Sequence, residues 1–75
     1  QGTKKMIKIF PNPVQDFITV AGLSGKTNYT ILNALGQNIG NGVVSENEKI
    51  AVKKITKGLY FLVLDNGTKI KFIKE

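Results

Sequence analysis

The chain has 75 residues, the size of one small domain, and it lacks cysteine, histidine and tryptophan. These absences exclude disulfides, thiol chemistry, the commonest structural zinc sites and any pair of a nucleophile with a histidine. The formal net charge is +6, with eleven lysines and no arginine, and no apolar run reaches the length of about 18 residues that predicts a membrane span.

Short segments of alternating apolar and polar residues, separated by turn residues, predict an all-β chain of about seven strands. No helical period persists beyond one turn. This pattern is typical of an immunoglobulin-like antiparallel β-sandwich. The expected strands are residues 5–10, 16–21, 27–33, 37–44, 49–52, 59–64 and 68–74.

A corner with two prolines separates the first two strands. Pro11 and Pro13 each fix their own φ near −65° and remove one backbone donor, and each disfavours helix at the preceding residue. The chain there is therefore extended but unable to pair as a central strand. We expect this corner to carry the chain from one sheet to the other. In the strand that follows, Phe17 is expected to be exposed, on the side away from Ile18 and Val20.

Glycines mark the later turns and one irregular strand. Gly36 closes a tight turn over residues 33–36, and residues 65–67 (Asp-Asn-Gly) are the strongest hairpin signal in the chain. Gly40 and Gly42 interrupt the fourth strand, which indicates a bulge or an edge.

The last two strands differ in pattern. Residues 59–64 are six apolar residues in a row, which predicts a central strand buried on both faces. In the final strand, Ile70 and Phe72 face one way and Lys69 and Lys71 the other, and Ile73 breaks this alternation.

Nothing in the sequence indicates catalysis, a cofactor or a metal site. Of the five acidic residues, only Glu46 and Glu48 lie close together, in a polar stretch that predicts a loop. A calcium site or a glycosidase pair needs converging carboxylates. The basic charge alone does not indicate nucleic-acid binding, because arginine, the preferred residue for base and phosphate recognition, is absent.

Four features follow one another in a fixed order along the chain: residues 10–13 (Phe-Pro-Asn-Pro) with Ile18 and Val20 after them, residues 29–37, residues 50–60, and the terminal residues 69–74. In this order they resemble the type A C-terminal sorting domain of the Bacteroidetes type IX (Por) secretion system. The resemblance extends from Ile9 to Lys74. Ile55 stands where the family often has Leu, and Phe10 where it often has Tyr.

The resemblance implies a non-enzymatic sorting signal behind a cargo domain on the same chain. Its implied partners are the type IX translocon, a shuttle protein and a sortase-like peptidase of the outer membrane. The cargo would pass through the periplasm and become secreted or attached to the cell surface, usually after cleavage. On this reading residues 1–5 are the end of an upstream linker and residues 6–75 the sorting domain.

The motif residues have two expected roles. Pro11, Asn12, Pro13, Gly36, Gly58 and Tyr60 are expected to serve the fold, Tyr60 as a tyrosine corner whose phenol bonds nearby backbone. The terminal strand supplies the candidates for recognition by the translocon, because an edge strand with chemically distinct sides can dock a partner, although lysines there also discourage aggregation. These candidates are Lys69, Lys71, Phe72, Ile73 and Lys74.

Two other functions stay open at the level of sequence. An immunoglobulin-like adhesion or carbohydrate-binding module would need exposed aromatic side chains, and Phe17 is the one candidate. A nucleic-acid-binding β-barrel would need aromatic and basic residues interleaved on one strand face. The terminal strand offers only Phe72, which points away from Lys69 and Lys71.

Overall fold

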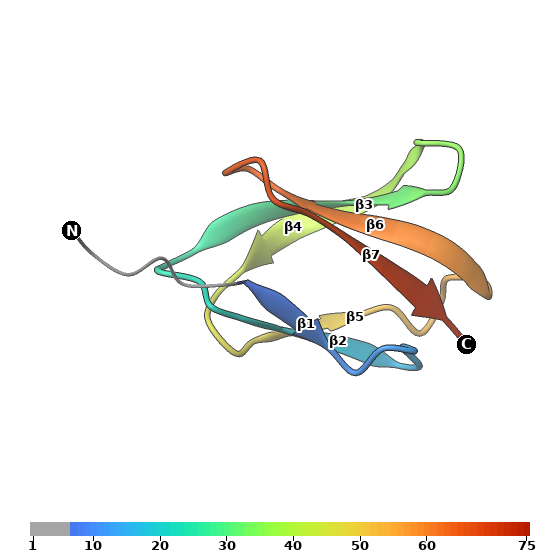
Figure 1. Cartoon of the computed structure of the whole chain (residues 1–75), viewed down its shortest axis with the longest axis horizontal. Coiled ribbons are helices and arrows are strands. Elements are labelled where there is room, and N and C mark those ends of the chain that lie inside the picture. The colour runs from blue at the N-terminus through green and yellow to red at the C-terminus, as the bar shows by residue number, and fades with distance from the viewer. Residues whose placement is uncertain (1–6) are drawn as a thin grey trace.

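Two antiparallel β-sheets lie face to face in the computed structural model, which describes residues 7–75 (Figure 1). Within these residues, one sheet has three strands in the order β1-β2-β5, and the other has four in the order β4-β3-β6-β7. The predicted all-β sandwich is therefore confirmed. The strands are β1 (Lys8–Phe10), β2 (Phe17–Ala21), β3 (Thr27–Asn33), β4 (Asn38–Val44), β5 (Lys49–Ala51), β6 (Gly58–Leu64) and β7 (Lys69–Lys74).

The first predicted strand begins at residue 5, and the predicted linker covers residues 1–5. The linker and the start of that strand lie outside the described residues, and β1 is described from Lys8. The other six predicted strands agree with the structure to within about one residue at either end, which is inside the usual uncertainty of strand boundaries.

The core lies between the two sheets, where alternate residues of the facing strands meet. In β2, Ile18 and Val20 point inward and are buried, while Phe17 is 45% exposed on the other face, as predicted. Each fully buried apolar side chain of this size contributes about 1.5–3 kcal/mol. Among residues 7–75, twelve side chains form the core: Val14, Ile18, Val20, Leu23, Ile31, Val44, Ile50, Val52, Tyr60, Leu62, Leu64 and Phe72.

Side-chain amides build the turns. The Asn33 Oδ1 atom accepts hydrogen bonds from the backbone N–H groups of Leu35 and Gln37, at 3.0 and 2.9 Å. Gly36 has a φ of 83°, a conformation that costs a residue with a side chain about 1 kcal/mol or more. The predicted tight turn is thus present, and it leads into β4.

The β4 strand is an edge strand with a bulge. Its pairing with β3 shifts by one residue, because Ile31 is opposite Gly40 whereas Leu32 is opposite Asn38. The bulge or edge predicted from the two glycines is confirmed in both respects.

The expected sheet crossing at the proline corner is wrong. β1 and β2, on either side of the corner, pair with each other in the same three-stranded sheet, with Ile9 opposite Val20. The corner instead bulges out of that sheet far enough for Val14 to reach the other one, where it forms a parallel bridge with Lys74 of β7. A segment that cannot pair as a central strand can still contact an edge.

The prediction that residues 59–64 are buried on both faces is also wrong. β6 is central in its sheet, between β3 and β7. Its inward residues Tyr60, Leu62 and Leu64 are buried, but Phe61 and Val63 on the outer face are only half-buried. A sandwich of two layers covers one face of each sheet, so an apolar run does not by itself show that both faces are covered.

Tyr60 forms the expected tyrosine corner. Its hydroxyl donates to the backbone carbonyl of Thr56 at 2.7 Å, and its ring stacks on Phe72 with the ring centroids 5.6 Å apart. These contacts attach the chain before β6 to the core and to the last strand. Gly58, at the start of β6, has a φ of 151°.

Candidate functional site

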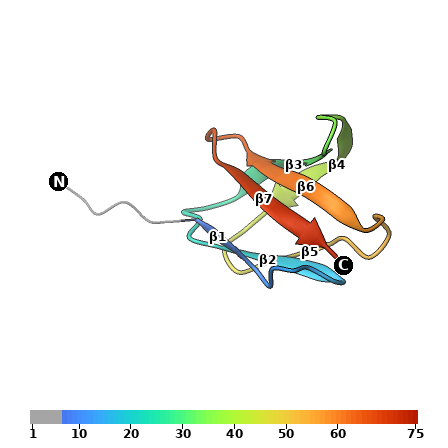
Figure 2. The same cartoon turned by 45° about the vertical axis from the view of Figure 1, so that its right-hand side comes forward.

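The proline corner (residues 11–14) holds the end of the terminal strand. The backbone N–H of Val14 donates to the carbonyl of Ile73 at 2.7 Å, and the N–H of Glu75 donates to the carbonyl of Val14 at 2.8 Å. The side-chain Oδ1 of Asn12 accepts from the N–H of Ile73 at 3.2 Å. Two segments 61 residues apart in sequence therefore form one site. Figures 1 and 2 show the loop between β1 and β2 beside the end of β7.

The two faces of β7 differ in chemistry. Phe72 is completely buried and Lys74 is 8% exposed, while Lys69, Lys71 and Ile73 are exposed on the opposite side. The structural alternation is thus unbroken: Ile73 continues the row of lysines, and Lys74 is the residue that departs from the chemical pattern. The Lys74 ammonium donates to the backbone carbonyl of Glu75 at 3.2 Å. Of the five candidate recognition residues, the structure exposes Lys69, Lys71 and Ile73.

The outer side of β6 extends this exposed row into a wider surface. Leu59, Phe61 and Val63 are half-buried there, directly opposite the three exposed residues of β7. The Lys69 ammonium lies 5.1 Å from the centroid of the Phe61 ring, a cation–π contact. We call this surface the terminal face; it consists of Leu59, Phe61, Val63, Lys69, Lys71 and Ile73.

β7 also leaves backbone groups unpaired along its outer edge. Ile73 directs its N–H and carbonyl away from β6 and toward the proline corner. The period of two along a strand directs the same groups of Lys71 and Lys69 to that side as well. Within residues 7–75 no strand lies beside them, because β7 ends its sheet and the corner reaches only residues 73–75. The free part of the edge is therefore near Lys69 and Lys71.

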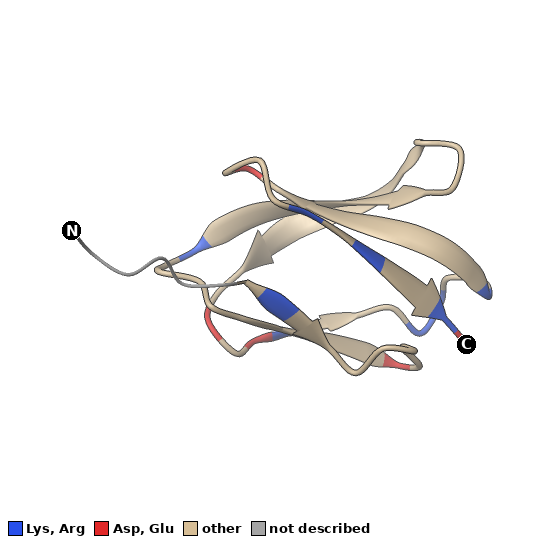
Figure 3. Cartoon of the chain, in the orientation of Figure 1, with Lys and Arg blue, Asp and Glu red and all other residues tan. Residues whose placement is uncertain are grey.

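Positive charge lies along this edge, and of the acidic residues described Glu75 alone lies beside it, directly after β7. Figure 3 shows lysine positions recurring along β7, with acidic positions in loops and turns. Three of the five acidic side chains have structural partners: Glu46 accepts from the N–H of Leu23, Glu48 from that of Ser45, and Asp65 from the side chain of Asn28. Between residues 7 and 75 no group of three or more potential metal ligands converges.

The motif residues do not all gather at one place. The proline corner lies at the end of β7, Gly58 is opposite Lys74, and Tyr60 is opposite Phe72. Gly36 lies apart, in the turn between β3 and β4 on the other side of the sheet. Sequence reasoning missed Val14 as a core residue that also bonds to β7. The only local signal was an apolar residue directly after Pro13.

Asn12→Ala tests whether the corner holds the terminal strand. The substitution removes the acceptor of the Ile73 N–H, and we expect a loss of about 0.5–1.5 kcal/mol in the free energy of unfolding. Urea denaturation measures that loss, and hydrogen exchange should show faster exchange at Ile73 than in the original chain. Asn41→Ala, at an exposed position on the far edge strand, is the control. Unchanged exchange at Ile73 would contradict the role given to Asn12.

The fold and its terminal strand define a class of small β-sandwich in which the last strand is a charged, partly open sheet edge. Comparison of the sequence with known protein families identifies the family of the chain. A family model described as "Secretion system C-terminal sorting domain" matches residues 8–75, and the chain belongs to that family.

One curated relative supports this assignment. The chain is 40% identical over 70 residues to a protein named beta-agarase A from Zobellia galactanivorans. The match covers 89% of this chain and 13% of that protein, so the chain spans only a small part of its relative. No solved structure matches the chain significantly.

The expected function is thereby confirmed at the level of the family. The chain is a C-terminal sorting domain of the Por, or type IX, secretion system, which implies an interaction with the secretion machinery and secretion across the outer membrane. Over residues 7–75, the structure has no helix with the length and apolar character needed to cross a membrane.

Proposed function

We propose that the secretion machinery recognises the terminal face and the free edge of β7. The observation that carries this proposal is that an apolar outer surface, uncovered by any other part of residues 7–75, adjoins a row of lysines and an open sheet edge. A partner strand can bond to such an edge, while side chains of the partner cover the adjoining apolar surface. Lys69, Lys71 and Ile73 are the proposed contacts, and Phe72 and Lys74 support the strand from inside.

Charge fits this proposal as well. The chain carries a net charge of +6, and lysines on an exposed edge attract an acidic surface over roughly a Debye length, about 8 Å at physiological ionic strength. Alternation of Lys with apolar residues also prevents edges of two sorting domains from pairing with each other. The same residues would then discourage self-association and favour an acidic partner.

The proposed route of the cargo out of the cell follows from membership of the family. A cargo domain precedes the sorting domain on the same chain and enters the periplasm, where the folded domain is bound by the translocon and its shuttle protein. A sortase-like peptidase cleaves upstream of the sorting domain. The cargo is then secreted or attached to the cell surface. Residues 1–5 would belong to the linker that connects the two parts, and residues 6–75 to the sorting domain.

An export experiment with two matched double variants tests the recognition surface. A fluorescent protein directed to the periplasm is fused to the chain and expressed in a host with a type IX system. Lys69→Glu/Lys71→Glu should abolish most of the export, because both charges at the free edge are reversed. Lys8→Glu/Lys26→Glu changes the net charge equally at exposed positions on β1 and before β3, and should retain export.

Fluorescence in the medium and on the cell surface is the readout, and circular dichroism of the purified chains checks that both variants remain folded. Equal export by the two double variants would contradict recognition at this edge. Loss of export by both would show that only the total charge matters, which also contradicts a defined contact surface.

A further inference from the structure

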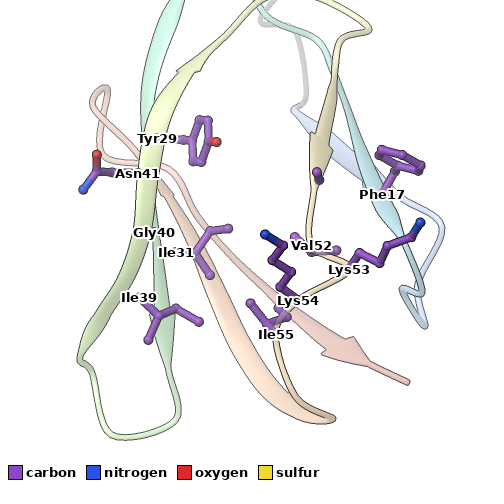
Figure 4. A pocket seen from close by; sticks show the side chains of 11 residues that line it. Phe17, Tyr29, Ile31, Ile39, Gly40, Asn41, Val52, Lys53, Lys54 and Ile55 are labelled. Atoms are coloured by element: carbon purple, nitrogen blue, oxygen red, sulfur yellow. The ribbon is translucent and has the colours of Figure 1, made fainter.

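A cleft opens on the side of the sandwich opposite β7. It lies between β4, the far edge of the four-stranded sheet, and β5, the edge of the three-stranded sheet, and has a volume of about 600 Å³ (Figure 4). This position separates it from the terminal face. Apolar side chains make up most of its walls: Phe17, Tyr29, Ile31, Ile39, Val52 and Ile55.

Two glycines on the inward side of β4 explain why the cleft is hollow. Gly42 is opposite Tyr29, and a Cβ atom there would come within 2.9 Å of the Tyr29 hydroxyl, so the ring fills that position. Gly40 is opposite the buried Ile31, and a Cβ atom there would meet no heavy atom within 4 Å. Its φ is not positive. Neither crowding nor backbone conformation requires glycine at position 40, and its missing side chain leaves the cleft open.

Lysines outnumber acidic residues around the cleft, where Asp16, next to Phe17 in sequence, accepts a backbone hydrogen bond from the Val52 N–H. Among residues 7–75, Lys53 and Lys54 are the charged residues that line the cleft, and Figure 4 shows their side chains between the apolar wall of the β4 sheet and Phe17. A third lysine, Lys49, lies with its ammonium 5.7 Å from the centroid of the Phe17 ring. Apolar walls with several ammonium groups nearby fit an apolar side chain that has carboxylates close to it in sequence.

The backbone geometry favours an extended occupant. β4 has no neighbour on its outer side within residues 7–75, so a segment can bond to it as an additional strand. Alternate side chains of such a strand would point between the two sheets and into the cleft. The residues between them would point outward, as Asn41 does in Figure 4.

We propose that this cleft binds an extended segment of another protein, with apolar residues that enter the space beside Gly40 and acidic residues that meet Lys53 and Lys54. This second surface is independent of the terminal face, because the two lie at opposite edges of the same sheet. If binding at the cleft is disproved, the proposed recognition of the terminal face is therefore unaffected, and the reverse also holds.

Nuclear magnetic resonance with synthetic peptides tests the proposal on the 75-residue chain. The probe is a peptide of about eight residues, enough for a strand along β4, with alternating Val and Phe in the middle and two Asp at each end. Its twin has Lys in place of every Asp. We expect the acidic peptide to shift the amide signals of Gly40, Ala51 and Ile55 at concentrations up to about 1 mM, and the basic twin to bind at least about tenfold more weakly.

Filling the cleft provides the matched variant. Gly40→Val should weaken binding at least about tenfold while the chain stays folded, because its side chain enters open space. Gly25→Val is the control, since Gly25 also has free space around it but does not line the cleft. Lys54→Glu should weaken binding of the acidic peptide, whereas Lys57→Glu, outside the cleft, should not. This second pair keeps the test valid if Gly40→Val does not fold.

Three results would overturn the proposal. The first is the absence of shifts at the cleft residues with either peptide. The second is equal binding of the acidic and basic peptides, which would remove the role of the lysines. The third is a concentration-dependent dimer that shifts the cleft signals without any peptide, since the occupant would then be a second copy of this chain.

Discussion

Replacing Phe72 with alanine is expected to lower the free energy of unfolding by about 3–5 kcal/mol, the usual cost of removing a buried aromatic ring. Phe72 is fully buried, stacks on Tyr60 and joins β7 to the core. A domain of this size has a total stability of only about 4–11 kcal/mol. The variant should therefore lose a large part of the stability of the domain, which urea and thermal denaturation measure as lower midpoints.

The adjacent residue supplies the control. Ile73→Ala changes an outward-facing side chain that is 42% exposed, and we expect a loss of about 1 kcal/mol or less. Similar losses for the two variants would contradict the assignment of inner and outer faces in β7.

The burial of Phe72 affects how the recognition surface can be studied. Removing residues 69–75 deletes a strand that pairs with β6 along its whole length, together with a central core residue. A truncated chain would not be exported because it would be unfolded, whether or not the secretion machinery binds β7. Point changes on the outer side and edge of β7 are needed to separate recognition from folding.

Lys71→Pro is expected to abolish most export without unfolding the domain. The N–H of Lys71 points to the free edge, so proline removes a donor for a partner strand but no hydrogen bond to β6. We expect a loss of about 1–3 kcal/mol in the free energy of unfolding, because proline holds φ near −65° whereas an antiparallel strand residue has a φ of about −140°. Export is measured with the fluorescent fusion, and stability with urea denaturation of the purified chain.

Lys71→Ala is the matched control for the backbone. It removes the same side-chain charge but keeps the N–H group, and we expect it to retain most of the export. Equal export by the alanine and proline variants would contradict strand addition at this edge. Recognition would then depend on the side chains of the terminal face alone.

The alternation of apolar and polar residues predicted the strands well, because strand formation and turns depend mainly on residues close together in sequence. Alternation placed Ile18 and Val20 inside and Phe17 outside. The turn at Gly36 and the hairpin at Gly67 have the positive φ values that their sequences indicate. The interruption of the fourth strand by glycines correctly indicated a bulged edge.

The errors concern which strands are neighbours, and this depends on contacts far apart in sequence. The proline corner was expected to cross between sheets, yet β1 and β2 pair with each other and the corner contacts β7 through Val14. No property of residues 11–14 specifies a partner more than fifty residues later; that partner follows from the packing of the two sheets.

The apolar run in β6 shows a second limit of sequence reasoning. A run of six apolar residues is compatible with a strand that is covered on both faces within its own domain. It is equally compatible with a strand whose outer face is covered only when another molecule binds. The sequence does not distinguish these cases, because the covering element can belong to another molecule. The cleft beside Gly40 was also not predictable from the sequence, because its two sides come from strands in different sheets.

Export in two host strains tests the central claim most directly. The periplasm-directed fluorescent protein fused to the 75-residue chain is expressed in a strain with a working type IX translocon and in the same strain without it. We expect fluorescence in the medium or on the surface of the first strain, and periplasmic retention in the second. Retention in both strains, or release from both, would contradict the conclusion that this domain acts as a sorting signal for that system.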